Sequence, residues 1–250
     1  MILSYKHRFV FVKGRKVAGT SIEMALSPHC GPRDIVTPIS PVDELKRMSL
    51  GGRPQNYAAN DRVEAQYIKL VREENNAEAI KTRVHSDKVY PFFNHMSLTA
   101  VEALLELPSQ EYTVIYSVRN PYAKLVSLAN MNLSLAKYTG KPMVNPAKNI
   151  RQSIQKLFET GGYNLARNHD LYQSKLPYRA RIVLRQEHLT GDFRNLLRQL
   201  GLNNCGPIPH AKQGSIGMGY AVEEMFTRAQ LDIINDIFAD EFHAHDYPMI

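Results

Sequence analysis

The sequence predicts an α/β fold: a mainly parallel β-sheet flanked by helices, within a single domain. Three short runs rich in β-branched and aromatic residues favour strands: "RFVFV" at 8–12, "YTVIYSV" at 112–118 and "ARIVLR" at 180–185. Helical patterns separate these runs, and strands that alternate with helices usually form a parallel sheet. A length of 250 residues suits one domain, so we expect residues 1–250 to form it.

The first strand leads into a loop with two glycines and then into a helix, which we expect Thr20 or Ser21 to cap. Residues 28–60 are rich in proline and predict an excursion with little regular structure. Residues 61–82 predict a charged, solvated helix. We therefore interpret 28–90 as an irregular and helical insertion.

A weak strand signal at 88–93 precedes a helix at 97–107, in which Thr99 and Glu102 have capping-box spacing. After the second strand, Pro121 stands where a first helical turn tolerates proline. Each of these positions lies between two predicted strands, as flanking helices require.

The last third of the chain predicts more helices. Residues 146–175 have a helical pattern with a break at Gly161 and Gly162, and 192–202 are amphipathic. Residues 203–220 read as a loop. Thr227 and Gln230 have the spacing of a capping box for a last helix over 231–242.

Charge and cysteine content limit the function classes. Lysine and arginine number 31 and aspartate and glutamate 24, a net charge of +7, which favours anionic partners such as nucleotides or acidic glycans, or is only a basic surface. The two cysteines, Cys30 and Cys205, allow one disulfide but no disulfide framework. With no signal peptide and no apolar run of 18 residues, we expect a cytoplasmic protein.

The first loop has the features of an anion cradle. Gly14 and Gly19 keep the spacing of a P-loop, but Thr20 stands where its lysine would follow, and the nearest lysine is Lys16 in mid-loop. Backbone N–H groups and a helix N-terminus still attract an anion. No strand ending in an aspartate that would hold Mg²⁺ follows. A 5′-phosphosulfate fits a cradle with one lysine and no metal.

The second loop contains an arginine at the end of a buried strand. Arg119 is followed by Asn120 and Pro121, a turn-initiating pair, and Ser127 lies two helical turns further on. A guanidinium presents a planar fork suited to phosphate. The alternative is that Arg119 pairs with a carboxylate such as Glu187.

Together these segments resemble the sulfotransferases that use 3′-phosphoadenosine 5′-phosphosulfate (PAPS), most closely the carbohydrate and heparan O-sulfotransferase branch with its bacterial members. "RKVAGTS" (15–21) is similar to a "PKTAGTS"-like loop, and "RNPYAKLVS" (119–127) to an "RNPYxRxxS"-like segment with Lys124 for arginine. Weaker similarity covers 184–202 and 233–247.

The resemblance implies a site. Lys16 would act on the sulfuryl and bridging oxygens, and the loop would cradle the 5′-phosphate. Arg119 and Ser127 would hold the 3′-phosphate, and Lys212, in the late loop, is a further candidate. The full set of implied donor-binding residues is Arg15, Lys16, Ala18, Gly19, Thr20, Ser21, Arg119, Ser127 and Lys212.

An acceptor hydroxyl would lose its proton to a general base. His95, just before a predicted helix, is the first candidate, followed by His85 and Glu187. No His, Cys, Asp or Glu spacing indicates a metal site. We expect no metal cofactor.

Two other classes stay open: a degenerate P-loop kinase or nucleotide phosphotransferase, and a non-enzymatic protein that binds a polyanion. The polyanion-binding class would require basic residues clustered on one face. The expected partner is a hydroxyl acceptor, either a carbohydrate or a small molecule. We expect residues 28–90 to shape part of the site that binds it. We expect neither nucleic acid binding nor stable membrane insertion, and the sequence does not define the oligomeric state.

Overall fold

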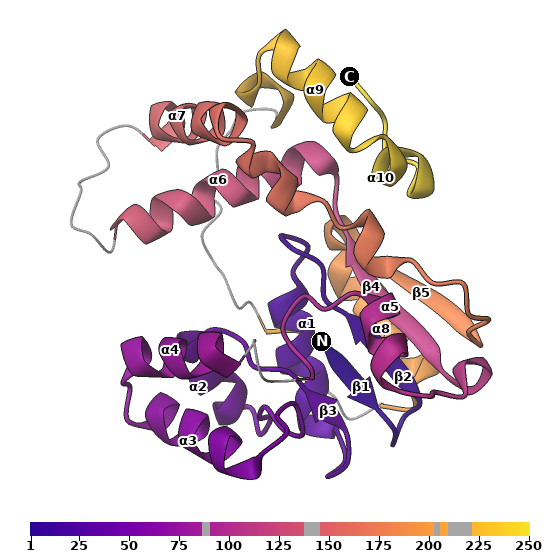
Figure 1. The fold of residues 1–250 in the computed structure, drawn as a ribbon. Coiled ribbons are helices and arrows are strands. Elements are labelled where there is room, and N and C mark those ends of the chain that lie inside the picture. The colour runs from indigo at the N-terminus through magenta and orange to yellow at the C-terminus, as the bar shows by residue number, and fades with distance from the viewer. Residues whose placement is uncertain (87–90, 138–145, 203–205, 210–221) are drawn as a thin grey trace. The chain divides into compact units, whose positions relative to one another are not determined.

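A five-stranded mixed sheet with flanking helices organises the chain, which is therefore an α/β domain (Figure 1). The computed structural model describes residues 1–86, 91–137, 146–202, 206–209 and 222–250. Its contacts divide into two compact units, described one at a time. The sheet unit comprises Met1–Gly14, Ala18–Ser117 and Asp170–Ala211, and the helical unit comprises Arg15–Val17, Val118–His169 and Lys212–Ile250.

The strands have the order β3-β1-β2-β4-β5. They are β1 (Ile2–Ser4), β2 (Phe9–Val12), β3 (Ile35–Val36), β4 (Thr113–Val118) and β5 (Ala180–Arg185). β2 and β4 are parallel, with Val12 opposite Tyr116, but β1 is antiparallel to both β2 and β3. The prediction of a mainly parallel sheet is therefore wrong at this edge, because a tight turn after Ser4 reverses the chain into β2.

Two helices pack on the sheet through one apolar cluster. Helix α1 (Gly19–Leu26) contributes Ile22 and Leu26, and α8 (Leu189–Gln199) contributes Phe193 and Leu196. These side chains meet inward residues of all five strands, such as Phe11 and Ile115. The three strands predicted from sequence are confirmed, although β5 buries only Leu184 and is an edge strand rather than a buried one.

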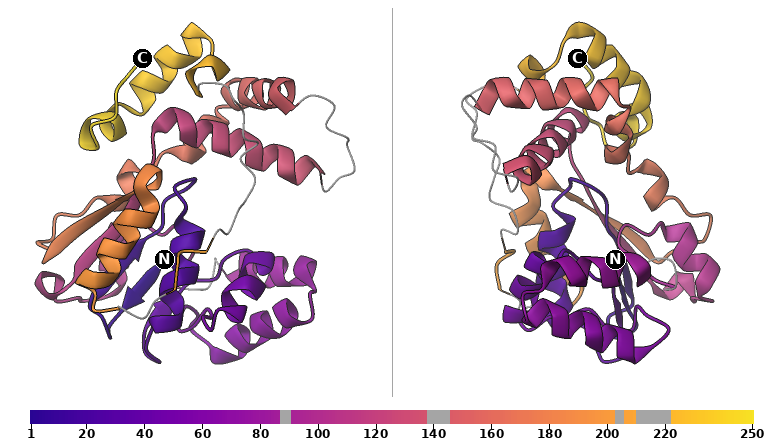
Figure 2. Two further views of the ribbon diagram at one scale, coloured as in Figure 1. Left: turned by 180° about the vertical axis from the view of Figure 1, so that it is seen from behind. Right: turned by 60° about the vertical axis from the view of Figure 1, so that its left-hand side comes forward.

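The insertion is more regular than its composition predicts. It contains α2 (Pro41–Ser49), which Ser40 caps by accepting from the Asp43 N–H, then α3 (Asp61–Arg72) and α4 (Asn76–Ser86). Figures 1 and 2 show these helices gathered together. The single helix predicted over 61–82 is thus two helices, because the chain turns at Glu74, whose φ is 53°.

Short helices and turns complete the sheet unit. The predicted helix near 97–107 is α5 (Leu98–Leu104), but Ser97 caps it, accepting from the Ala100 N–H, so the Thr99–Glu102 capping box is wrong. Glu102 instead accepts from Tyr178. Of the weak strand signal at 88–93, residues 91–93 are not a strand and the rest lies outside the described residues.

The helical unit is built from α6 (Pro121–Lys137), α7 (Pro146–Glu159), α9 (Arg228–Ile237) and α10 (Ala239–Ala244) (Figure 2). The predicted start at Pro121, the break after α7 and the Thr227–Gln230 capping box are confirmed. The predicted last helix is two helices that meet at Phe238. A core of Tyr122, Leu125, Ile154 and Phe238 joins them.

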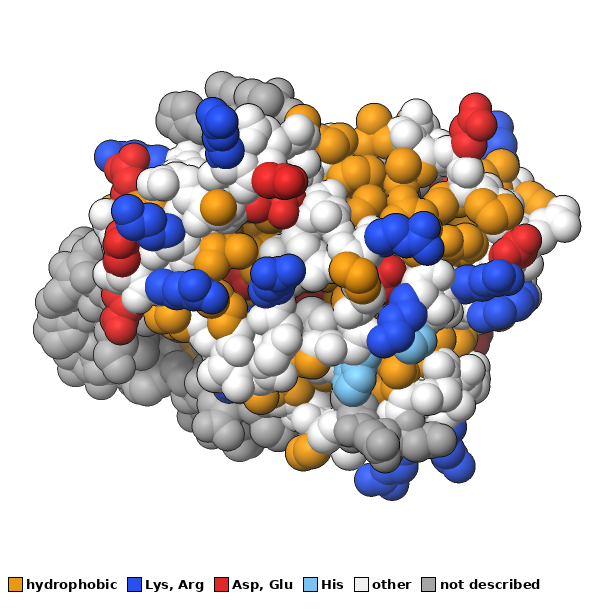
Figure 3. Space-filling view, turned by 90° about the horizontal axis from the view of Figure 1, so that it is seen from below, with side chains coloured by type: hydrophobic (Ala, Val, Ile, Leu, Met, Phe, Trp, Pro, Cys, Tyr) orange, Lys and Arg blue, Asp and Glu red, His pale blue; other side chains and the backbone are white. Residues whose placement is uncertain are grey.

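Two features of the whole chain bear on function. None of the helices within the described ranges is long and apolar enough to cross a membrane. On the face shown in Figure 3, acidic, hydrophobic and other side chains separate most of the Lys and Arg side chains. That face does not carry the basic cluster that a polyanion-binding protein would require.

Candidate functional site

The glycine loop leads straight into helix α1. The helix begins at Gly19, and its N-cap is Ala18, whose φ of 62° and ψ of 16° are left-handed. Thr20 and Ser21 lie inside the first turn, so the prediction that one of them caps the helix is wrong. An alanine offers no capping side chain, and an anion is another way to satisfy the first N–H groups of a helix.

Gly19 occupies a position with no room for a side chain. A Cβ there would lie 2.7 Å from Lys13 Cγ and 3.3 Å from the Gly14 carbonyl oxygen. The chain therefore comes close to itself at the start and end of the loop. Close backbone packing of this kind is what a phosphate-binding loop requires of its glycine.

Lys13 is a residue that the sequence reasoning missed. It directly follows β2, it is 3% exposed, and its ammonium lies 2.6 Å from the Glu23 carboxylate of α1. Glu23 also accepts from the Met1 amino group. A lysine at the end of an apolar strand and a glutamate within the apolar run of 22–26 were the available signals. The pair ties the strand to the helix beneath the loop.

Opposing effects set the ionisation of Glu23. Burial raises the pKa of the carboxyl, but Lys13, the Met1 amino group and Arg47 overcome it and lower the pKa from 4.5 to about 2. Glu23 is therefore a carboxylate at neutral pH, and with Lys13 it forms a buried ion pair.

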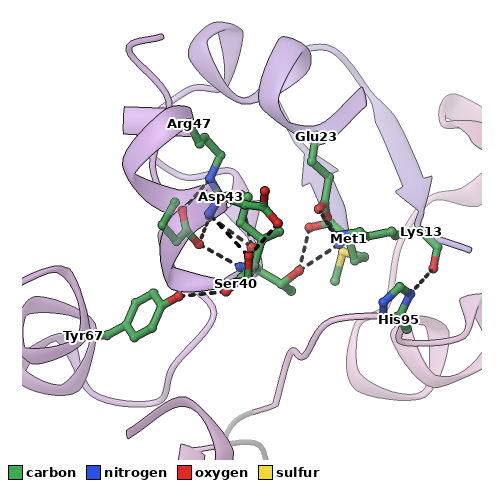
Figure 4. A network of polar contacts seen from close by, with 11 residues as sticks. Met1, Lys13, Glu23, Ser40, Asp43, Arg47, Tyr67 and His95 are labelled. Atoms are coloured by element: carbon green, nitrogen blue, oxygen red, sulfur yellow. Dashed lines mark hydrogen bonds and ion pairs between the residues drawn. The ribbon is translucent and has the colours of Figure 1, made fainter. Parts of the chain in front are cut away.

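His95 lies beside the carboxyl end of β2. Its Nδ1 is 3.0 Å from the Lys13 carbonyl oxygen. Lys13 therefore contacts His95 through its backbone and Glu23 through its side chain (Figure 4). Because a carbonyl oxygen only accepts, Nδ1 carries a proton and donates it, and in the neutral ring Nε2 is then unprotonated. His95 also has a φ of 61°, a conformation rare outside glycine. The ring is held in the tautomer that a general base requires.

The other candidate bases have weaker support. Glu187 lies in the short helical turn Gln186–His188 and is exposed. His85 belongs to α4, and its side chain is outside the described residues.

The middle of the loop belongs to the helical unit. Lys16 has a φ of 64°, so Lys16 and Ala18 are two left-handed non-glycine residues within three positions. Such conformations persist where surrounding contacts hold them, and they cluster at functional sites. Arg15 is held through its backbone, since its N–H donates to Asn168 Oδ1 at 2.7 Å.

Arg119 and Ser127 lie in the same unit as Lys16. Asn120 caps α6, because its Oδ1 accepts from the N–H groups of Tyr122 and Ala123 at 3.0 and 3.3 Å. This cap occupies the first N–H groups of the helix, so anion binding at this turn would fall to the guanidinium of Arg119, which stays a prediction. Ser127 is half-buried on α6.

The implied site residues therefore fall into two sets. The sheet unit holds Ala18, Gly19, Thr20, Ser21 and His95, and the helical unit holds Arg15, Lys16, Arg119 and Ser127. Lys212 lies outside the described residues, and so does Cys205, whereas Cys30 is a free thiol. That all of them bind one nucleotide stays a prediction.

A hollow of about 600 Å³ lies in the insertion, between α2 and α3. Met48 and Ile68 line it together with three cations: Arg53, Lys69 and Arg72. It lies within 28–90, the segment predicted to shape an acceptor site, and that role stays a prediction. Among the described residues, no group of three or more His, Cys, Asp or Glu side chains could hold a metal ion.

Comparisons with known proteins add no relative. No protein-family model, curated protein or solved structure matches the chain.

Proposed function

We propose that the protein is a sulfotransferase that uses PAPS to sulfate a hydroxyl of a carbohydrate or small molecule. The observation that carries the proposal is the hydrogen bond from His95 Nδ1 to the carbonyl of Lys13, at the strand end where the glycine loop begins. It supports a general base beside an anion-binding loop. The resemblance of 15–21 and 119–127 to sulfotransferase segments gives the anion its identity.

The chain's own residues fit such a donor. When bound, PAPS supplies a sulfuryl group that an acceptor hydroxyl takes by in-line displacement. Gly19 allows the loop to pack closely against Lys13, and no side chain caps α1, whose first N–H groups attract phosphate oxygens. The Lys16 ammonium neutralises charge on the leaving side, and such electrostatic stabilisation is usually the largest catalytic effect.

The acceptor side needs a proton acceptor. His95 takes the hydroxyl proton at Nε2, because Nδ1 already donates to the Lys13 carbonyl. Arg119 holds the 3′-phosphate that distinguishes the donor from ADP and ATP. The degenerate kinase would instead need a lysine at position 20, where threonine stands.

A thermal-shift series with 3′-phosphoadenosine 5′-phosphate (PAP), ADP and Mg·ATP tests the proposal. We expect PAP to stabilise most, by about 2.7 kcal/mol at a concentration of 100 Kd. A preference for Mg·ATP would favour the kinase, and indifference to all three the polyanion-binding protein. Labelled PAPS with a panel of acceptors would then identify the substrate.

Lys16→Ala tests the proposed catalytic lysine. We expect turnover to fall by about 10²–10³-fold, because one charge-stabilising donor is lost at the leaving group, while the melting temperature changes little. Lys175→Ala, an exposed lysine of the sheet unit, is the matched control. Sulfation by Lys16→Ala at the rate of the control would contradict the role.

A further inference from the structure

Asn168 holds the backbone of Arg15 from both sides. Its Oδ1 accepts from the Arg15 N–H at 2.7 Å, and its Nδ2 donates to the Arg15 carbonyl at 2.9 Å. Asn168 is 1% exposed. One side chain thus satisfies both polar groups of the residue that precedes Lys16, as a neighbouring strand would.

Asn168 is itself held by a buried ion pair. Its backbone N–H donates to Glu241 Oε1 at 2.8 Å, and the other carboxylate oxygen of Glu241 pairs with Lys124. The Lys124 ammonium also donates to the Ala166 carbonyl at 3.1 Å and lies 4.7 Å from the centre of the Phe238 ring. Contacts therefore run without a break from α6 and α10 to the loop.

The energetics of this cluster favour a positioning role. Lys124 is fully buried and Glu241 nearly so, and removing two charges from water offsets most of their mutual attraction. Burial lowers the pKa of Lys124 below its ordinary value, because the opposing effect of Glu241 is smaller. A buried ion pair is thus weak support for stability alone, but it fixes geometry. Lys16, which follows Arg15, has a left-handed backbone conformation, and such a conformation persists only where neighbouring contacts stabilise it.

We propose that Asn168 and Glu241 are positioning residues that hold Arg15 so that Lys16 keeps its place in the loop. This inference rests on the proposed function for the role of Lys16. It also gives the segment 119–127 two separate roles. Arg119 binds the donor, whereas Lys124, turned into the core, supports the loop through Glu241 and Asn168.

Amide hydrogen exchange at Arg15 tests the contact without reference to function. In the wild type we expect the Arg15 N–H to exchange at least tenfold more slowly than an unprotected loop amide. Asn168→Ala should accelerate that exchange about tenfold, because both hydrogen bonds to Arg15 are lost. Asn164→Ala is the matched control, since Asn164 is exposed and its side chain, among the described contacts, donates to the local Gly161 carbonyl alone. If the Arg15 N–H of the wild type exchanges as fast as an unprotected amide, the proposal is overturned. This measurement needs only the wild type, so it decides even if Asn168→Ala does not fold.

Turnover tests the positioning. In Asn168→Ala we expect kcat with PAPS to fall about 10²-fold while the KM for PAPS stays within about threefold, because a misplaced catalytic group affects the reaction more than binding. A merely structural role would lower the melting temperature without this split. Unchanged kcat with accelerated exchange would overturn the positioning role. If the wild type binds no PAP, the proposed function fails, and exchange still decides whether Asn168 holds the loop.

A matched pair of double variants tests Glu241. Lys124→Met/Glu241→Gln removes both charges but keeps an acceptor for the Asn168 N–H, whereas Lys124→Met/Glu241→Met removes the acceptor too. Replacing a buried ion pair by neutral groups of similar volume is often tolerated. We expect the first to keep Arg15 exchange within about threefold of the wild type and the second to accelerate it about tenfold. Equal exchange in both would remove Glu241 from the proposal.

Discussion

At the residue scale, the bond between His95 and the Lys13 carbonyl makes a specific prediction. His95→Asn keeps an N–H donor and a residue type that tolerates a positive φ, but it removes the base. We expect kcat to fall by about 10²–10⁴-fold, with PAP affinity by calorimetry within about threefold of the wild type.

A second histidine provides the control for this substitution. His7 Nε2 lies 3.1 Å from the His29 carbonyl, so His7→Asn makes the same change at a ring that also contacts a backbone carbonyl. It should leave turnover unaltered. If His95→Asn turned over as fast as His7→Asn, the base would have to be sought elsewhere.

Glu23 predicts a pH effect on stability. Its pKa is about 2 in the folded protein and 4.5 ordinarily, so its contribution is complete above about pH 4.5 and is lost as the pH falls toward 2. At pH 7, Glu23→Gln should lower the free energy of unfolding by about 3–5 kcal/mol, since Lys13 is left buried without its carboxylate. Denaturant unfolding should show this gap narrowing between pH 4.5 and 2.

An exposed ion pair calibrates that measurement. Glu111 pairs with Arg8 at 2.7 Å, and both side chains are more than half exposed. Glu111→Gln should change the free energy of unfolding by about 1 kcal/mol at most. The buried pair would be contradicted if Glu23→Gln changed the free energy of unfolding as little as Glu111→Gln does. A change that did not vary with pH would also contradict it.

From the sequence, candidate site residues could be predicted where they belong to a short local motif. Gly19, Lys16 and Arg119 stand in short segments whose spacing, position at a strand end and family resemblance made them candidates. Asn168 could not be found this way, because its partners Arg15 and Glu241 are 153 and 73 residues away. Only folding brings them together, and no local pattern reports it.

At the element scale, the start of α1 depends on the missing side chain at Gly19. Gly19→Ala places a Cβ 2.7 Å from Lys13 Cγ, a side chain that its ion pair with Glu23 holds in place. We expect a loss of about 1–3 kcal/mol in the free energy of unfolding from this overpacking, together with weaker PAP binding.

Another helical glycine is the control. A Cβ on Gly191 in α8 would meet nothing within 4 Å, so Gly191→Ala should be neutral or stabilise by up to about 1 kcal/mol. Chemical denaturation compares the two variants directly. Equal effects would mean that Lys13 yields and that the loop does not need its glycine.

Strand and helix patterns were predictive where burial is simple. β2 and β4 lie within one residue of their predicted ranges and α6 begins at Pro121 as expected, because an apolar run or a proline start decides them. β1 and β3 were missed, since strands of three and two residues are too short for a pattern to show. Ala18 took the cap that Thr20 or Ser21 was expected to provide because the loop packs onto Lys13, a tertiary effect.

At the scale of the whole molecule, the net charge of +7 attracts anions of any kind. The choice of one particular anion must therefore come from individual side chains. Acidic and neutral side chains separate most of the basic side chains in Figure 3, so the visible face carries no continuous basic patch. A bisphosphorylated nucleotide, in contrast, needs separate cations for its two phosphates. Lys16 and Arg119 are the proposed pair.

Removing one cation should therefore change the choice of nucleotide rather than abolish binding. In the wild type we expect PAP to bind more tightly than ADP, equally with EDTA or Mg²⁺, because no phosphate in the proposed site requires a metal ion. Arg119→Ala should weaken PAP binding by about 10–100-fold and ADP binding much less, since only PAP has a 3′-phosphate for the guanidinium. Arg194→Ala, on the exposed side of α8, should preserve the preference. If calorimetry showed an unchanged ratio of PAP to ADP affinity in Arg119→Ala, the 3′-phosphate would have to be held by another residue.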